Sequence, residues 1–118
     1  MKALAIIAVL LALPGNRVGL ERPATEADLL RAFGFARCLA KAYEKTPFGV
    51  DAERVADGYF QMGRLKRQQP YDQVTVAAES IDAARPTIQG HQNLAIMKCL
   101  EFYESPRLKK TAAQLASQ

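Results

Sequence analysis

The sequence has little of what catalysis and metal binding require. Among its 118 residues there is no tryptophan, one histidine (His91) and two cysteines (Cys38 and Cys99). One histidine without a CxxC pair disfavours a zinc site, which takes several Cys or His ligands. The chain also has no glycine-rich phosphate loop, and its serines carry no nucleophile-elbow signature. We therefore expect no enzymatic activity, no metal and no cofactor.

The chain also lacks an apolar run long enough to cross a membrane. After Lys2, the unbroken apolar run Ala3–Leu13 is followed by a proline and a glycine. A membrane span needs about 20 such residues, whereas a positive start, a short apolar centre and a helix-breaking exit are typical of a secretory signal. We expect residues 1–19 to be a cleaved signal peptide without a stable membrane anchor, and residues 20–118 to be one exported domain. No A-x-A pattern marks the cleavage position.

The charge of the chain is mild once the signal is removed. Lys2 and Arg17 leave with residues 1–19 and no acidic residue does, so the formal net charge falls from +4 by two, to +2. Nucleic-acid-binding domains are usually strongly basic. The weak charge and the oxidising destination therefore disfavour nucleic acid as a partner.

Each cysteine lies within an amphipathic helical pattern. Cys38 is part of RCLAKAY (37–43) and Cys99 is part of MKCLEFY (97–103). In an exported domain, two cysteines most simply form one intramolecular disulfide. Such a bridge would join an early helix to a late one and stabilise the fold by about 4 kcal/mol in the chain-entropy description. Two buried free thiols are the alternative if the chain is not exported.

Apolar residues recur at helical spacing, and strand patterns are almost absent. The first helix should start at Thr25, with Asp28 completing a capping box, and end near Lys45. We expect the following Thr-Pro-Phe-Gly segment to break the chain, so that Asp51 caps a second helix ending near Met62. The residues expected to face inward from the second helix are Val55, Ala56, Tyr59 and Phe60.

Further helices follow at short intervals. Pro70 suits the first turn of a third helix, which Pro86 prevents from continuing, and Asn93 can cap a fourth. The expected inward residues of the third helix are Tyr71, Val74, Ala77, Ala78, Ile81 and Ala84. The expected apolar set of the fourth is Leu94, Ile96, Met97, Cys99, Leu100 and Tyr103.

A short last helix should begin at Ser105-Pro106, a serine cap followed by proline, and dock through Leu108, Ala112 and Leu115. Within the first helix, Gly34 costs about 1 kcal/mol relative to alanine, which suggests that another helix passes close by. The expected fold is all-α: a small disulfide-stapled bundle of four main helices plus a short C-terminal helix.

Around the two cysteines the chain resembles the immunity proteins that neutralise type VI secretion amidase effectors, specifically the group paired with the fourth amidase effector family. The matching features are RCLAKAY, a Y-F-x-M-G segment at Tyr59–Gly63, and MKCLEFY followed by a short polar break. The resemblance extends over about residues 24–110. It implies a periplasmic all-helical protein, usually a homodimer, whose bridge joins Cys38 to Cys99. Such a protein binds a peptidoglycan amidase and blocks its Cys-His cleft, protecting the producing cell.

By position, the cleft-blocking element of that family corresponds to the connector before the second cysteine motif. The connector residues are Ile88, Gln89, Gly90, His91, Gln92 and Asn93. Loops commonly carry binding residues. Gln89 and His91 would suit a wet catalytic cleft, and Ile88 could be an apolar anchor. The residues by themselves are equally consistent with an ordinary helix connector.

A small periplasmic acid-stress chaperone is the alternative, because such proteins are also helical, disulfide-bonded and of similar length. A chaperone of this kind must expose apolar surface when carboxylates are protonated. The twelve acidic residues here are not clustered, and one histidine gives little switching near pH 6. The sequence therefore favours the immunity function.

Overall fold

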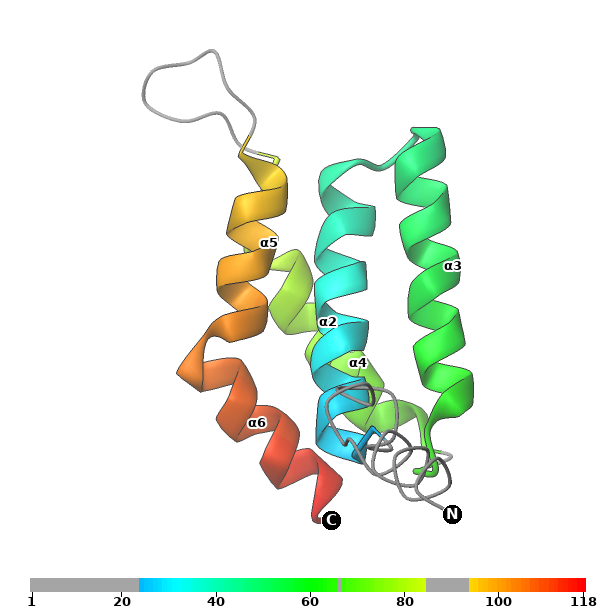
Figure 1. Ribbon diagram of the computed structural model, residues 1–118, viewed down its shortest axis with the longest axis vertical. Helices are drawn as coiled ribbons and strands as arrows, with labels where there is room; N and C mark the ends of the chain where they lie inside the picture. The colour runs from blue at the N-terminus through cyan, green and yellow to red at the C-terminus, as the bar shows by residue number, and fades with distance from the viewer. Residues whose placement is uncertain (1–23, 66, 85–93) are drawn as a thin grey trace, which may run out of the picture.

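The computed structural model describes residues 24–65, 67–84 and 94–118, and within these ranges all regular secondary structure is helical. The helices are α2 (Glu26–Ala42), α3 (Pro47–Met62), α4 (Gln68–Glu79), α5 (Ala95–Glu104) and α6 (Pro106–Ala116). Figure 1 shows α2 at the centre with α3 and α5 on either side, α4 behind it and α6 below α5. The all-α prediction is confirmed.

Helix α2 is the centre of the bundle because it contacts each of the other four helices, whereas α3 packs mainly on α2. The sequence of α2 explains this position, since its buried residues point in several directions. They are Leu29, Leu30, Phe33, Gly34, Ala36 and Cys38. A helix that is apolar over a wide arc must be covered on more than one side.

Two of the predicted helix starts are confirmed. At α2, the Thr25 side chain accepts from the Asp28 N–H (3.0 Å), and the Asp28 carboxylate accepts from the Thr25 N–H (3.2 Å). At α6, the Ser105 hydroxyl oxygen accepts from the Leu108 N–H (3.2 Å), with proline at the first helical position. Both caps satisfy backbone donors that the first helical turn leaves unpaired.

The predicted start of the second helix is wrong. Helix α3 begins at Pro47, and Thr46, not Asp51, is its cap: the Thr46 hydroxyl oxygen accepts from the Gly49 N–H (3.0 Å). Thr-Pro is a cap followed by a favoured first residue, so it starts a helix here. The preceding helix ends at Ala42, before the predicted Lys45, which takes a left-handed conformation (φ 66°) in the tight turn.

The third helix also ends earlier than Pro86. Helix α4 stops at Glu79, and Asp82 follows with φ 53°, a left-handed conformation that Asp tolerates better than most residues. Ile81 is therefore only partly buried and Ala84 is exposed, whereas Ala83 enters the core. The predicted position of Pro70 in the first helical turn is confirmed.

The predicted inner face of the fourth helix is largely wrong. The buried residues of α5 are Ala95, Cys99 and Phe102, while Ile96, Met97 and Leu100 are about half exposed; Val55 of α3, also expected inside, is 49% exposed. The helix is apolar around most of its circumference, so periodicity could not identify the inward side. Leu94 occupies the N-cap position, and Asn93 lies outside the described residues.

The close approach predicted at Gly34 is confirmed. A Cβ atom placed there would lie 2.8 Å from Cγ1 of Val74 in α4 and 3.2 Å from Cε2 of Phe102 in α5. Both helices therefore pass α2 at this point with no room for a side chain. This is why glycine occupies a helix interior despite its poor helix propensity.

Tyr71 is the largest fully buried side chain of the core. Its ring makes edge-to-face contacts with Phe33 and Phe60, with centroids 4.9 and 4.8 Å apart, a favourable aromatic geometry. Its hydroxyl group has no hydrogen-bond partner among the residues that the structure describes. Burial, and to a smaller extent the Glu26 carboxylate, raise the pKa of Tyr71 above its usual value of 10.0.

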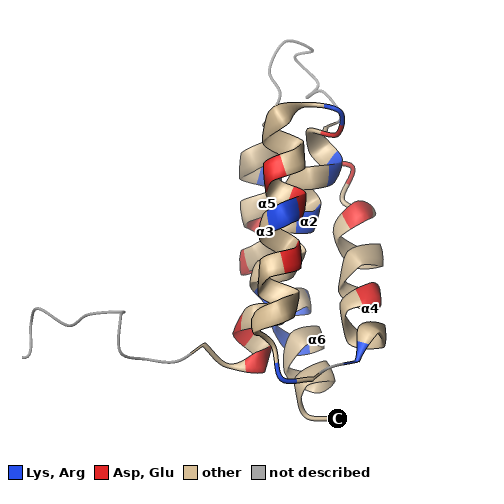
Figure 2. Cartoon of the chain, turned by 90° about the vertical axis from the view of Figure 1, so that its right-hand side faces the viewer, with Lys and Arg blue, Asp and Glu red and all other residues tan. Residues whose placement is uncertain are grey.

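Charged side chains also tie helices together. Lys, Arg, Asp and Glu residues are spread along the helices in the view of Figure 2. Arg37 of α2 lies 3.1 Å from the carboxylate of Glu79 in α4 and 3.7 Å from that of Glu53 in α3. The carboxylates of both pairs are open to solvent, which screens the charges, so each pair stabilises the fold by about 1 kcal/mol or less.

Candidate functional site

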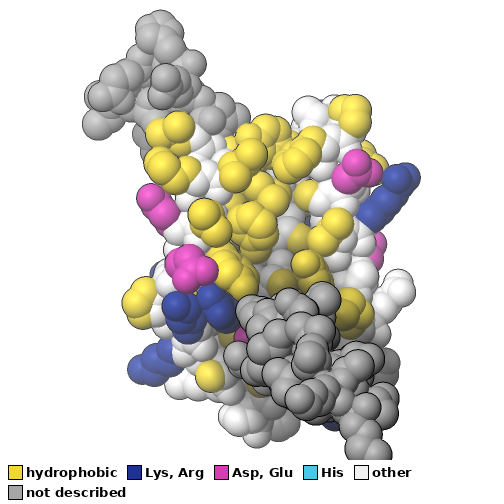
Figure 3. Space-filling view, viewed as in Figure 1, with side chains coloured by type: hydrophobic (Ala, Val, Ile, Leu, Met, Phe, Trp, Pro, Cys, Tyr) yellow, Lys and Arg dark blue, Asp and Glu magenta, His cyan; other side chains and the backbone are white. Residues whose placement is uncertain are grey.

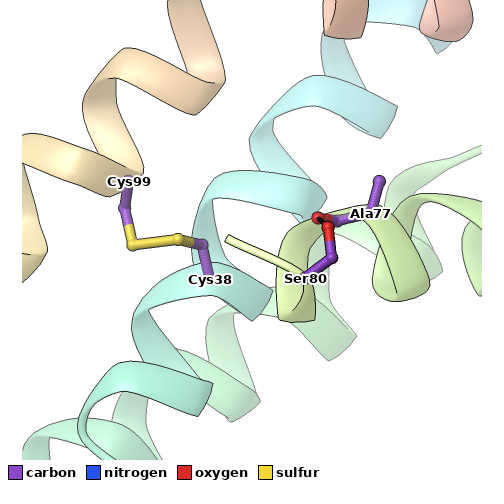
Figure 4. The surroundings of a disulfide bond; sticks show 4 residues. All are labelled: Cys38, Ala77, Ser80 and Cys99. Atoms are coloured by element: carbon purple, nitrogen blue, oxygen red, sulfur yellow. Dashed lines mark hydrogen bonds between the residues drawn. A yellow bond between two sulfur atoms is a disulfide. The ribbon is translucent and has the colours of Figure 1, made fainter. Parts of the chain in front are cut away.

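A disulfide joins Cys38 of α2 to Cys99 of α5, as predicted. The Cα atoms are 5.6 Å apart, within the usual range for a bridge, and both residues are almost fully buried. Figure 4 shows the bridge running from α5 to α2. Nearby, Ser80 caps the end of α4, and its hydroxyl donates to the Ala77 carbonyl (2.7 Å). Because neither cysteine of the chain is free, no thiolate is available as a nucleophile.

The bridge fixes the rotation of α5 about its own axis. Cys99 has to face α2, and Ala95 and Phe102, which lie within one turn of it on one flank of the helix, are buried with it. Ile96 is also three positions from Cys99 but lies on the other flank, and with Met97 and Leu100 it is about half exposed.

Arg31 of α2 binds the C-terminal end of α5. Its Nη2 and Nε atoms donate to the Tyr103 carbonyl at 2.9 and 3.3 Å, and its guanidinium carbon lies 4.3 Å from the centroid of the Tyr103 ring. Carbonyls in the last turn of a helix lack partners within that helix, so a cation there is stabilising. Helix α5 is thus attached at its centre by the disulfide and at its end by Arg31.

The predicted contact residues Ile88, Gln89, Gly90, His91, Gln92 and Asn93 lie outside the residues that the structure describes. What the structure does place is the chain on either side of them. Ala83, shortly before the connector, and Ala95, at the first position of α5, belong to one buried cluster with Cys99. Both flanks of the connector are therefore fixed to the core.

Sequence reasoning missed an exposed apolar surface beside this connector, because it assigned the same residues to the core. Ile96, Met97 and Leu100 expose 53%, 48% and 49% of their surface. In the first turn of α3, Phe48 and Val50 are also nearly half exposed. Figure 3 shows apolar side chains gathered over the upper parts of α5, α2 and α3. The only signal in the sequence was that apolar residues occupy more of this helix than one inward face can bury.

A cavity of about 410 Å³ opens between α4, α5 and α6. Ile81, Phe102 and Leu108 contribute to its apolar lining, and Lys98, Glu101 and Arg107 are among its polar residues. Ser105, which also lines it, donates its hydroxyl to the Phe102 carbonyl (2.7 Å) and caps α6. This serine serves the helix boundary, since its hydroxyl group caps α6 and bonds the last turn of α5.

In the parts of the chain that the structure describes, no three His, Cys, Asp or Glu side chains are grouped so as to hold a metal ion. Among the helices described here, none has the length and hydropathy needed to cross a bilayer.

Comparison with known proteins identifies the family. No curated protein and no solved structure matches the chain significantly. A protein-family model described as type VI secretion system (T6SS), amidase immunity protein, matches residues 28–112. The match covers most of the chain and includes both cysteines, the connector and the greater part of the bundle. Proteins of this kind act in the periplasm and are paired with an amidase effector. The chain belongs to the family of type VI secretion system amidase immunity proteins.

Proposed function

We propose that this protein binds a cognate peptidoglycan amidase effector, blocks its active-site cleft and so protects the cell that produces it. The observation that carries the proposal is the family match over residues 28–112, which includes the connector 88–93. In this proposal the protein acts by binding and not by catalysis. Both of its cysteines are held in a disulfide, which accords with such a role. The match gives no support to an acid-stress chaperone.

The attachment of α5 supports a blocking role for the connector. An inhibitor loses affinity if its binding loop must be ordered on association. Here the chain enters α5 from the connector, and α5 is bridged to α2 through Cys99 only six positions after Asn93. In the proposed complex, Gln89 and His91 hydrogen-bond within the polar cleft, and Ile88 is the apolar anchor.

The proposal includes export and self-association. Residues 1–19 direct the chain to the periplasm, where an oxidising environment closes the Cys38–Cys99 bridge. The mature protein, residues 20–118, forms a homodimer. The molar mass of the purified mature protein, measured by light scattering, tests this state.

The test of the function uses the mature protein and its cognate amidase, identified by co-purification. In a peptidoglycan cleavage assay, the wild-type protein should inhibit the amidase. Replacing Gln89, Gly90 and His91 together by alanine should weaken inhibition without lowering the melting temperature. The matched control replaces Lys110 and Gln114, exposed residues of α6, by alanine and should inhibit normally.

Two results would contradict different parts of this proposal. If the wild-type protein neither binds nor inhibits the amidase, the function is wrong. If the connector variant inhibits as well as wild type, the amidase is blocked elsewhere and only the assignment of the connector fails.

A further inference from the structure

Helix α5 carries apolar side chains on two opposite sides, and only one side is buried within the chain. The buried side consists of Ala95, Cys99 and Phe102. The other side consists of Ile96, Met97 and Leu100, here called the outer α5 face, and about half of each side chain is exposed. Helices on protein surfaces normally place polar residues opposite the core. Large apolar side chains grouped in this way mark an interaction site more often than scattered ones do.

The outer α5 face cannot be buried by rolling the helix. Such a rotation would turn Cys99 away from Cys38, to which it is covalently joined. It would also remove the Tyr103 carbonyl from Arg31, which donates two hydrogen bonds to it. The exposure of this face is therefore a fixed property of the fold.

The outer α5 face begins directly beside the proposed contact segment. Ile96 follows Asn93 by three positions, and each helical residue rises 1.5 Å, so the face occupies roughly the first 9 Å of the helix. The start of α5 and the start of α3 lie at the same end of the bundle (Figure 1). Phe48 and Val50 of α3 add exposed apolar surface at that end.

The connector alone is too small to form a stable interface with the amidase. A stable complex buries about 800 Å² per partner and uses roughly 20–30 residues on each side, more than the six connector residues supply. The interface must therefore continue onto neighbouring elements. Before the connector, Ile81 is partly buried and Ala83 is buried. After it, the outer α5 face offers three large exposed side chains, and interface centres are typically apolar with a polar rim.

We propose that the outer α5 face is an apolar part of the amidase-binding surface. It packs against non-polar residues beside the mouth of the amidase cleft while the connector enters the cleft. This inference rests on the proposed function and extends its contact surface. A second copy of the chain is the competing occupant. A two-fold dimer over this face would bring the bases of both connectors together and hinder access of the amidase to them.

The test replaces Ile96, Met97 and Leu100 by glutamine in the otherwise intact mature protein. Glutamine favours helices, and the side chains are already half exposed, so the fold should be retained. The matched control replaces Met62 and Val76 by glutamine, because they are exposed by 64% and 70% and lie on α3 and α4. Calorimetry measures the Kd for the purified cognate amidase, and light scattering measures the oligomeric state of each variant alone.

The α5 variant should bind the amidase at least about tenfold more weakly, as expected for the loss of an interface anchor. The control should stay within about twofold of wild type, and both variants should keep the wild-type molar mass. If the triple variant is not folded by circular dichroism, Met97→Gln and Met62→Gln give the same comparison with one identical substitution each. The Kd should then rise several-fold for Met97→Gln alone.

An unchanged Kd for a folded α5 variant would overturn the inference while leaving the proposed function intact. A change from dimer to monomer with unchanged amidase affinity would assign the face to a second copy and would also overturn it. Failure of the wild-type protein to bind the amidase would refute the proposed function, and the inference with it.

Discussion

Gly34 in α2 and Gly58 in α3 form a matched pair that measures how closely the helices pack on α2. Both lie in helix interiors, where alanine is favoured over glycine by about 1 kcal/mol. A Cβ atom at Gly58 would meet no described atom within 4 Å beyond the local backbone of its own helix, whereas one at Gly34 would lie 2.8 Å from Cγ1 of Val74 and 3.2 Å from Cε2 of Phe102. Substitution by alanine therefore changes helix propensity equally at the two sites but changes packing at only one.

The structure gives the direction and size of each effect. Gly58→Ala should raise the free energy of unfolding by about 1 kcal/mol. Gly34→Ala gains the same amount but overpacks the core, which costs about 1–3 kcal/mol. Val74 is fully buried, and its β-branched side chain has little rotational freedom, so the methyl group cannot easily move away. We expect a net loss of about 1 kcal/mol for Gly34→Ala and a difference of about 2 kcal/mol between the variants.

Urea unfolding of the two mature variants with the disulfide intact, followed by circular dichroism, measures this difference directly. Thermal unfolding should place their midpoints about 8–16 °C apart, since 1 kcal/mol shifts the midpoint of a domain this size by about 4–8 °C. If Gly34→Ala proved as stable as Gly58→Ala, α4 and α5 would not approach α2 as closely as described. The account of Gly34 would then be wrong.

Two other predictions concern the core. Replacing Cys38 and Cys99 together by alanine should lower the free energy of unfolding by about 4 kcal/mol, because the bridge spans 61 positions and its removal frees the unfolded chain; an unchanged urea midpoint would contradict this. Tyr71→Phe removes a hydroxyl group that has no hydrogen-bond partner within residues 24–65, 67–84 and 94–118, so it should cost less than about 1 kcal/mol in urea unfolding at neutral pH. Because the pKa of Tyr71 is raised in the folded state, the unfolded chain loses this proton first, and the wild-type protein should lose stability as pH rises through about 10. The Tyr71→Phe variant should lose less stability over the same pH range. Equal losses in the two proteins would show that Tyr71 does not cause this pH dependence.

Local signals in the sequence predicted those parts of the fold that local interactions determine. Thr25 with Asp28, and Ser105 with Pro106, form caps whose hydrogen bonds lie within one turn, so both helix starts could be predicted. Thr46-Pro47 carries the same kind of signal, but Asp51 a few residues later is a second candidate cap. Proline there can either break the chain or start a helix, and the neighbouring residues alone do not decide between the two.

The orientation of α5 was not predictable, because contacts distant in sequence determine it. Its apolar residues occupy most of the helix circumference, so periodicity allows several inward faces. The face that turns inward is chosen by the bond from Cys99 to Cys38 and by the hydrogen bonds from Arg31 to Tyr103. The resemblance around the cysteines indicated the connector but carried no information on Ile96 and Leu100, which were assigned to the core.

The 61 positions between the two half-cystines also set an order of events for an exported chain. A chain that crosses the membrane amino terminus first delivers Cys38 to the oxidising side well before Cys99 arrives. During that interval Cys38 has no thiol of its own chain to pair with. Under the proposed export, correct maturation therefore requires that Cys38 stay available, as a thiol or as an exchangeable mixed disulfide, until Cys99 has followed.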